Sequence, residues 1–94
     1  MARTAILLTI VGDVQGVGFR AFIRGEAERL GLHGWVRNRF DGSIEALVIG
    51  ESDTVDALLE SCGTNAPPAA DIHELNFCGA EDDGSIKFVQ RPTV

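Results

Sequence analysis

The sequence predicts an α+β fold, in which one antiparallel sheet carries two helices on one face. Two observations support this class. The spacing of the apolar residues switches between the periods of strands and helices, and glycines separate the periodic segments. With 94 residues the chain is long enough for one domain, which we assign to residues 1–94. The predicted order is strand, helix, strand, strand, helix, strand, with a short extra strand at the C-terminus. This is the split β-α-β-β-α-β pattern of ferredoxin-like folds.

The first predicted unit is a strand, a glycine-rich turn and a helix. Residues 4–12 are apolar on both faces, which indicates a central strand. The turn covers residues 12–18. From Phe19 to Leu30, apolar residues recur at steps of three and four, which predicts an amphipathic helix. Gly31 is then the glycine expected just after a helix end.

The next predicted unit is a hairpin. Residues 34–40 and 43–49 alternate as strands, and Asp41-Gly42 between them is a strong signal for a tight turn. We expect the C-terminal end of the first strand and the strand over 34–40 to be neighbours in the sheet, as the split pattern allows.

A second helix is predicted after Gly50. Ser52 or Asp53 is its expected cap, and Gly63 its expected end. The rest of the chain reads as a loop over 64–69, a strand over 70–78, an acidic turn over 81–84 and a last strand over 85–90.

The net charge of −6 argues against non-specific binding of nucleic acid. The charge is uneven, however. Residues 1–40 hold six arginines and three acidic residues, whereas residues 41–94 hold two basic and eleven acidic ones. The arginines gathered in the first part indicate a local anion site. Chance clustering on solvated faces is the alternative, and composition alone favours it.

The cysteines and histidines show no spacing typical of a metal site. Cys62 ends the second helix and Cys78 lies near the far end of the following strand, about 25 Å away for seven or eight strand residues. A disulfide needs Cα atoms within about 7 Å, so we expect free thiols. His33 and His73 stand alone. We therefore expect neither a metal nor a cofactor.

The N-terminal apolar stretch is too short for a membrane span, and it lacks the features of a signal peptide. These features and the free thiols predict a cytoplasmic protein without a membrane partner.

The most informative segment is the turn and helix start over residues 12–20. Glycines allow successive backbone N–H groups to face one point, and a helix N-terminus adds further donors and a partial positive charge. Arg20 lies where its guanidinium can bind the same anion through two hydrogen bonds. The segment matches neither the P-loop nor the dinucleotide fingerprint. From these residues alone, an oxyanion site and a tight connection with a surface arginine are equally supported.

Two motifs carry a resemblance to a known family. Residues 12–20 read Gly-x-Val-Gln-Gly-Val-x-Phe-Arg, which resembles the first signature of the acylphosphatase family. Residues 34–38 read Gly-Trp-Val-Arg-Asn and are followed by Gly42, Ile44 and Gly50, which resembles the second signature. Ile44 stands where valine is usual, a conservative change in a strand.

The resemblance covers roughly residues 5–78 and implies hydrolysis of the carboxyl–phosphate anhydride bond of acyl phosphates, without a metal. It implies that Arg20 binds the phosphate and that Asn38 positions the attacking water. It also implies phosphate binding by the backbone amides of Val14, Gln15, Gly16, Val17, Gly18 and Phe19. The loop over 63–69 is longer than is usual, which leaves its effect on substrate access open.

Strand alternation directs Arg37 and Trp35 to the face opposite Asn38. We therefore leave Arg37 out of the site. For Trp35, packing against the sheet is favoured over a role as a platform for the acyl group.

Two other functions are open. A module of the same fold could bind acyl or carbamoyl phosphate without catalysis. An RNA-binding domain of this fold is disfavoured by the negative charge and by the absence of tyrosine. The expected partners are a small acyl phosphate and the product phosphate, and we expect a monomer.

Overall fold

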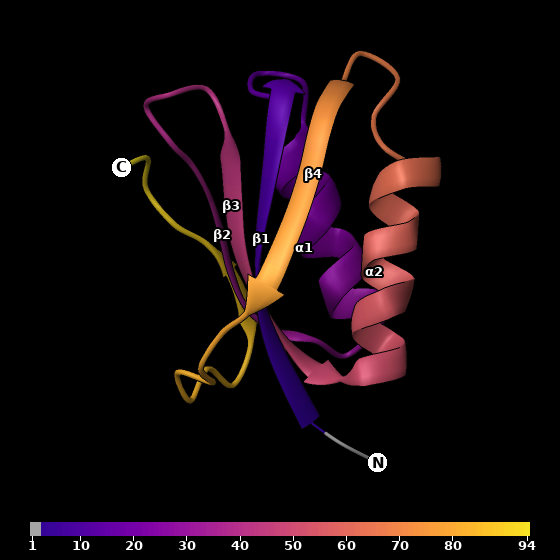
Figure 1. Ribbon diagram of the computed structural model, residues 1–94, viewed down its shortest axis with the longest axis vertical. Helices are drawn as coiled ribbons and strands as arrows, with labels where there is room; N and C mark the ends of the chain where they lie inside the picture. The colour runs from indigo at the N-terminus through magenta and orange to yellow at the C-terminus, as the bar shows by residue number, and fades with distance from the viewer. Residues whose placement is uncertain (1–2) are drawn as a thin grey trace.

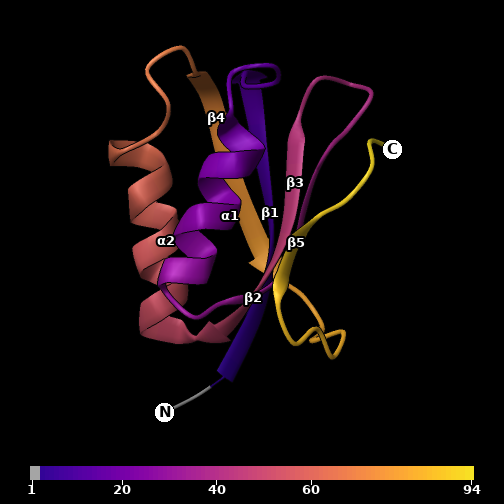
Figure 2. The same ribbon diagram turned by 180° about the vertical axis from the view of Figure 1, so that it is seen from behind.

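The computed structural model describes residues 3–94, and its elements follow the order that the sequence predicts (Figure 1). Residues 1–2 of the predicted domain lie outside the described residues. The elements are β1 (Arg3–Asp13), α1 (Phe19–Arg29), β2 (His33–Asn38), β3 (Ile44–Glu51), α2 (Ser52–Thr64), β4 (Asp71–Gly79) and β5 (Phe88–Gln90). Both helices cover the same face of one sheet, as the two opposite views in Figures 1 and 2 show. The predicted α+β, ferredoxin-like fold is confirmed.

The sheet has the strand order β4-β1-β3-β2-β5. β1 pairs antiparallel with β3 and β4, and β2 pairs antiparallel with β3. β5 pairs parallel with β2, so the sheet is mixed and not, as the sequence predicted, antiparallel throughout. The expectation that β1 and β2 are neighbours is wrong, because the hairpin partner β3 lies between them.

This order brings the C-terminal ends of three strands to the same end of the sheet. β1 and β2 both run antiparallel to β3, so they run in the same direction, and β5 runs parallel to β2. The loop from β1 to α1 crosses over β3 at this end of the sheet, because α1 packs over β2 and β5.

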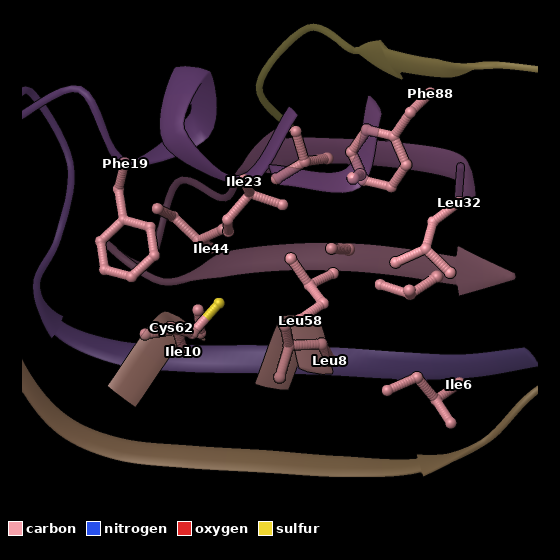
Figure 3. Close-up of a cluster of buried hydrophobic side chains, with 14 of the residues drawn as sticks. Ile6, Leu8, Ile10, Phe19, Ile23, Leu32, Ile44, Leu58, Cys62 and Phe88 are labelled. Carbon is pink, nitrogen blue, oxygen red and sulfur yellow. The ribbon is translucent and has the colours of Figure 1, made fainter. Parts of the chain in front are cut away.

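The main core lies between the sheet and the helices (Figure 3). Alternate residues of β1 face it, and α1 contributes the side chains that recur at helical steps. Its fully buried larger members include Leu8, Ile10, Phe19, Ile23, Ile44, Leu58, Val36 and Val48. Phe19 is both the first residue of α1 and a core residue, so packing fixes where this helix begins.

On the other face of the sheet, Trp35 packs with a smaller apolar cluster and is 8% exposed. The guanidinium groups of Arg37 and Arg91 lie over its ring, at 4.5 and 5.0 Å from the ring centroid. Arg37 also pairs with Glu45 at 2.6 Å. The prediction that Trp35 and Arg37 share this face, and that Trp35 packs against the sheet, is confirmed.

The start of α2 differs from the prediction. Its N-cap is Glu51, in an extended conformation, and no side chain caps the helix; Ser52 and Asp53 already lie inside it. The reason is that β3 continues directly into α2 without a loop. The helix also continues one residue past Gly63, to Thr64. Within the described residues, neither helix is long and apolar enough to cross a membrane.

A polar contact joins the two helices. The hydroxyl of Ser61 on α2 donates a 2.5 Å hydrogen bond to the carboxylate of Glu26 on α1, which also pairs with Arg29. Arg29 and Ser61 lower the pKa of Glu26 to about 2. Because the folded-state pKa is depressed, this contact stabilises the fold fully above the ordinary pKa of 4.5. The stabilisation is lost as the pH falls toward 2.

Both cysteines are free, as predicted. Cys62 is buried in the core on α2, and burial raises the pKa of its thiol to about 12. Cys78 is exposed on β4.

Candidate functional site

A pocket of about 130 Å³ lies where the ends of β2 and β5 meet the loop after β1 and the start of α1. Its walls come from residues far apart in the chain, which the strand order brings together. They are Val14, Gly16, Gly18, Phe19, Arg20, Ala21, Asn38 and Gln90. Six of these residues belong to the predicted site.

The loop depends on two glycines with left-handed backbone conformations. Gly16 has φ +75° and Gly18 has φ +82°, and a Cβ at either position meets no atom within 4 Å. The requirement for glycine is therefore conformational and not steric. Gly18 is the N-cap of α1, and its carbonyl accepts a 3.0 Å hydrogen bond from the Phe22 N–H.

The N-terminus of α1 is electrostatically suited to an external anion. No side chain caps the helix, and no acidic residue lies in its first turn. The first N–H groups of a helix have no acceptor within it, and they carry a partial positive charge. A phosphate oxygen at this position would be bound by backbone donors.

Arg20 is the charged side chain of the pocket. It is half-buried, and it is the only arginine among residues 3–94 without a carboxylate within 4.0 Å. The paired arginines are Arg3 with Asp82, Arg24 with Glu28, Arg29 with Glu26, Arg37 and Arg39 with Glu45, and Arg91 with Asp83. The guanidinium of Arg20 is therefore free to bind an anion from solution.

Asn38 closes the pocket from the end of β2. Its Oδ1 atom is buried and has no hydrogen-bond partner in the described part of the chain. Its backbone is held on both sides, by pairing with Ile44 of β3 and by a 3.2 Å hydrogen bond from the Val94 N–H to its carbonyl. A buried carbonyl oxygen without a partner is costly, and a water in the pocket would satisfy it.

Gln15 contributes to the site through its side chain. Its Nε2 donates hydrogen bonds to the backbone carbonyls of Arg39 at 2.7 Å and Ser43 at 2.9 Å. Both carbonyls lie in the turn of the hairpin that carries Asn38. The side chain therefore ties the predicted phosphate loop to the predicted water-positioning strand.

The structure thus separates the predicted loop residues into two groups. Val14, Gly16, Gly18 and Phe19 line the pocket, whereas Gln15 and Val17 do not. Val17 packs against the core instead. Gln15 is a polar residue among glycines and valines, and this was the signal in the sequence for its side-chain hydrogen bonds. Nothing in the sequence pointed to Gln90, because its position depends on the parallel pairing of β5.

His73 does not stand alone, contrary to expectation. Its Nε2 lies 3.2 Å from Asp71 Oδ2, and its ring, Asp71 and Asp13 bring potential ligand atoms within 4.8 Å of one another. Asp13 and Asp71 are paired across β1 and β4, and His73 lies two residues further along β4, at the irregularity in this pairing. All three side chains are exposed.

The fold and the pocket define a small α+β domain whose first βα turn lines a pocket with one unpaired arginine among the described residues. The model of the acylphosphatase family matches residues 6–89. An acylphosphatase of Acidiphilium cryptum is 46% identical over 86 residues, covering 92% of this chain and 93% of the relative. The chain belongs to the acylphosphatase family, and its enzymatic activity is that of an acylphosphatase.

Solved structures agree with this assignment. The crystal structure of acylphosphatase from Bacillus subtilis superposes with a TM-score of 0.88 at 30% identity, over 96% of this chain and 99% of that one. Full-length HypF, in a phosphate- and nucleotide-bound form, superposes with a TM-score of 0.93 at 28% identity. That match covers 98% of this chain and only 12% of HypF.

Proposed function

We propose that this pocket hydrolyses acyl phosphates by direct attack of a water on the phosphorus atom. Arg20 and the backbone amides of residues 14–19 bind the phosphoryl oxygens, and Asn38 positions the water. The leaving group is a carboxylate of low basicity, so the enzyme needs little assistance at that end. Its main tasks are to bind the phosphoryl group, to stabilise the charge of the transition state and to orient the water.

The proposed reaction is a single in-line displacement. The water oxygen forms a bond to phosphorus while the bond from phosphorus to the bridging oxygen breaks. The bridging oxygen keeps the electron pair of that bond and leaves as part of the carboxylate. An amide such as that of Asn38 accepts and donates hydrogen bonds but is not a base. One water proton therefore passes to a phosphoryl oxygen, which gives dihydrogen phosphate.

The observation that carries this proposal is that one pocket contains two polar groups, each without a partner among the described residues. Arg20 has no carboxylate partner among the described residues, and the buried Oδ1 of Asn38 has no hydrogen-bond partner there. One group requires an anion and the other requires a hydrogen-bond donor such as water. Acyl phosphate and water together satisfy both.

The test is release of phosphate from benzoyl phosphate in the presence of a metal chelator. We expect the wild type to be active and Arg20→Gln to lose at least about 10²-fold in kcat/KM, because one charged donor to the phosphoryl group is removed. Arg24→Gln is the matched control, since Arg24 lies on the same helix and pairs with Glu28 at 3.7 Å. Equal activity of the Arg20 and Arg24 variants would contradict the proposal.

A binding module without catalysis is the second candidate, because the domain also matches part of the much longer HypF. The same assay separates the two functions. A wild type that binds inorganic phosphate and releases none from benzoyl phosphate would be such a module.

We further propose that the protein acts as a cytoplasmic, single-domain monomer without a nucleic-acid partner. The free thiols fit a reducing compartment, and the net charge of −6 opposes binding to nucleic acid. Sedimentation of the purified chain at several concentrations tests the monomer.

A further inference from the structure

We propose that Gln90 binds the carbonyl oxygen of the acyl group and so selects acyl phosphates over other phosphate compounds. This inference rests on the proposed function of the pocket. It assigns a role to a residue outside both family motifs, and it concerns the end of the substrate that Arg20 and Asn38 leave unbound.

The pairing of β5 places Gln90 beside the pocket. Gln90 is the last residue of β5 and pairs in parallel register with Val36 of β2. Phe88, two residues earlier, is buried in the core under the helices. Because residues two apart in a strand share a face, the Gln90 side chain lies on the helix side, where it lines the pocket.

The walls of the pocket contain few polar side chains. Only Arg20, Asn38 and Gln90 contribute side chains with polar ends, since the other lining residues are glycine, alanine, valine and phenylalanine. Arg20 and Asn38 are assigned to the phosphoryl group and the water. Gln90 is therefore the one polar side chain of the pocket that is left for the acyl group.

The polar side chains of the pocket differ in their exposure to solvent. Arg20 and Asn38 are half-buried, whereas Gln90 lines the same pocket and is exposed to solvent. The phosphoryl group is held in the interior, so the acyl group must extend toward solvent. Its carbonyl oxygen is the one feature that every acyl phosphate shares. The Nε2 of Gln90 can donate a hydrogen bond to that oxygen and leave the remaining acyl portion free.

This arrangement predicts a particular selectivity. The hydrogen bond favours compounds with a carbonyl two bonds from phosphorus, whatever the rest of the acyl group. It also stabilises the negative charge that develops on the leaving carboxylate. Simple phosphate monoesters have no such carbonyl and gain nothing from Gln90.

The test uses binding, so that it does not depend on turnover. Acetonylphosphonate has the carbonyl of acetyl phosphate, with a methylene group in place of the scissile oxygen. Propylphosphonate lacks the carbonyl, and inorganic phosphate lacks the whole acyl end. We expect Gln90→Leu to weaken binding of acetonylphosphonate by about 3- to 10-fold, the range of one hydrogen bond. Binding of propylphosphonate and of inorganic phosphate should not change.

Lys87→Leu is the control variant, because Lys87 is exposed near β5 and does not line the pocket. It should leave the affinities for all three compounds unchanged, and thermal unfolding should show both variants folded. Equal losses for the three compounds in Gln90→Leu, or no loss, would overturn the assignment of Gln90. Failure of the wild type to bind inorganic phosphate would instead contradict the proposed function of the pocket itself.

Discussion

Residues 3–94 contain two junctions from strand to helix, and the pocket that holds Arg20 and Asn38 lies at the first of them. β3 continues directly into α2, and this junction has acidic residues at its start, with Glu51 as the N-cap and Asp53 in the first turn. β1 is joined to α1 by a loop with two left-handed glycines, and that helix has no acidic residue in its first turn. The positive end of α2 is thus complemented from within the chain, and that of α1 is not.

The difference shows how one fold separates stability from function. A carboxylate near a helix N-terminus stabilises the helix and occupies the position that an anionic ligand would take. The first junction lacks such a carboxylate and has Arg20 in its place. The partial positive charge at the N-terminus of α1 therefore has no carboxylate of the first turn beside it, as expected of a site that binds an anion.

The largest effect on activity is expected from Asn38→Ala, which changes the pocket at the first junction. Without the buried amide, the water is no longer oriented, and kcat for benzoyl phosphate should fall by about 10²-fold. Affinity for inorganic phosphate should remain, because the loop and Arg20 are unchanged. A large loss of phosphate affinity, measured by competitive inhibition, would show that Asn38 belongs to the phosphate-binding part of the pocket.

Glycine substitutions sharpen the comparison between loop and helix. Gly18→Ala places a side chain at φ +82° and should reduce the free energy of unfolding by about 1–2 kcal/mol, with weaker binding of phosphate. Gly63→Ala is the counterpart in α2, where a Cβ meets no atom within 4 Å. It should raise the free energy of unfolding by up to about 1 kcal/mol. Chemical denaturation of both variants measures these shifts, and equal shifts would contradict the conformational role of Gly18.

The tether between the loop and the hairpin predicts a smaller effect on activity. Gln15→Leu removes the hydrogen bonds to the carbonyls of Arg39 and Ser43. Because these bonds hold the phosphate loop against the hairpin that carries Asn38, we expect kcat to fall by about 3- to 10-fold. KM should change less. A rise in KM with no change in kcat would show that Gln15 acts in substrate binding and not in the alignment of Asn38.

The smallest effect is expected at the second junction. Asp53→Asn removes a carboxylate from the first turn of α2 and should cost about 0.3–1 kcal/mol of stability at low salt. Activity should be unchanged, because this junction binds no substrate. The stability loss should shrink in high salt, and a loss of activity in this variant would remove the distinction between the two junctions.

Local patterns in the sequence predicted more of the first junction than of the pocket as a whole. The glycines and Arg20 lie within one short segment, so their spacing alone supported an oxyanion site, equally with a tight turn beside a surface arginine. Asn38 was found only through the family resemblance, because an asparagine before a hairpin turn is ordinary. The positions of Gln15 and Gln90 relative to Asn38 depend on contacts between distant strands. Those contacts include β3 lying between β1 and β2, a strand order that no local pattern in the sequence indicates.

We propose that the first junction binds phosphate and that the second does not. Titration of the ¹⁵N-labelled protein with inorganic phosphate, followed by amide chemical shifts, distinguishes the two junctions. We expect saturable shifts at residues 14–20 and little change at residues 51–54, with the shifts at 14–20 lost in Arg20→Gln. Equal shifts at both helix N-termini, or none at residues 14–20, would contradict this proposal.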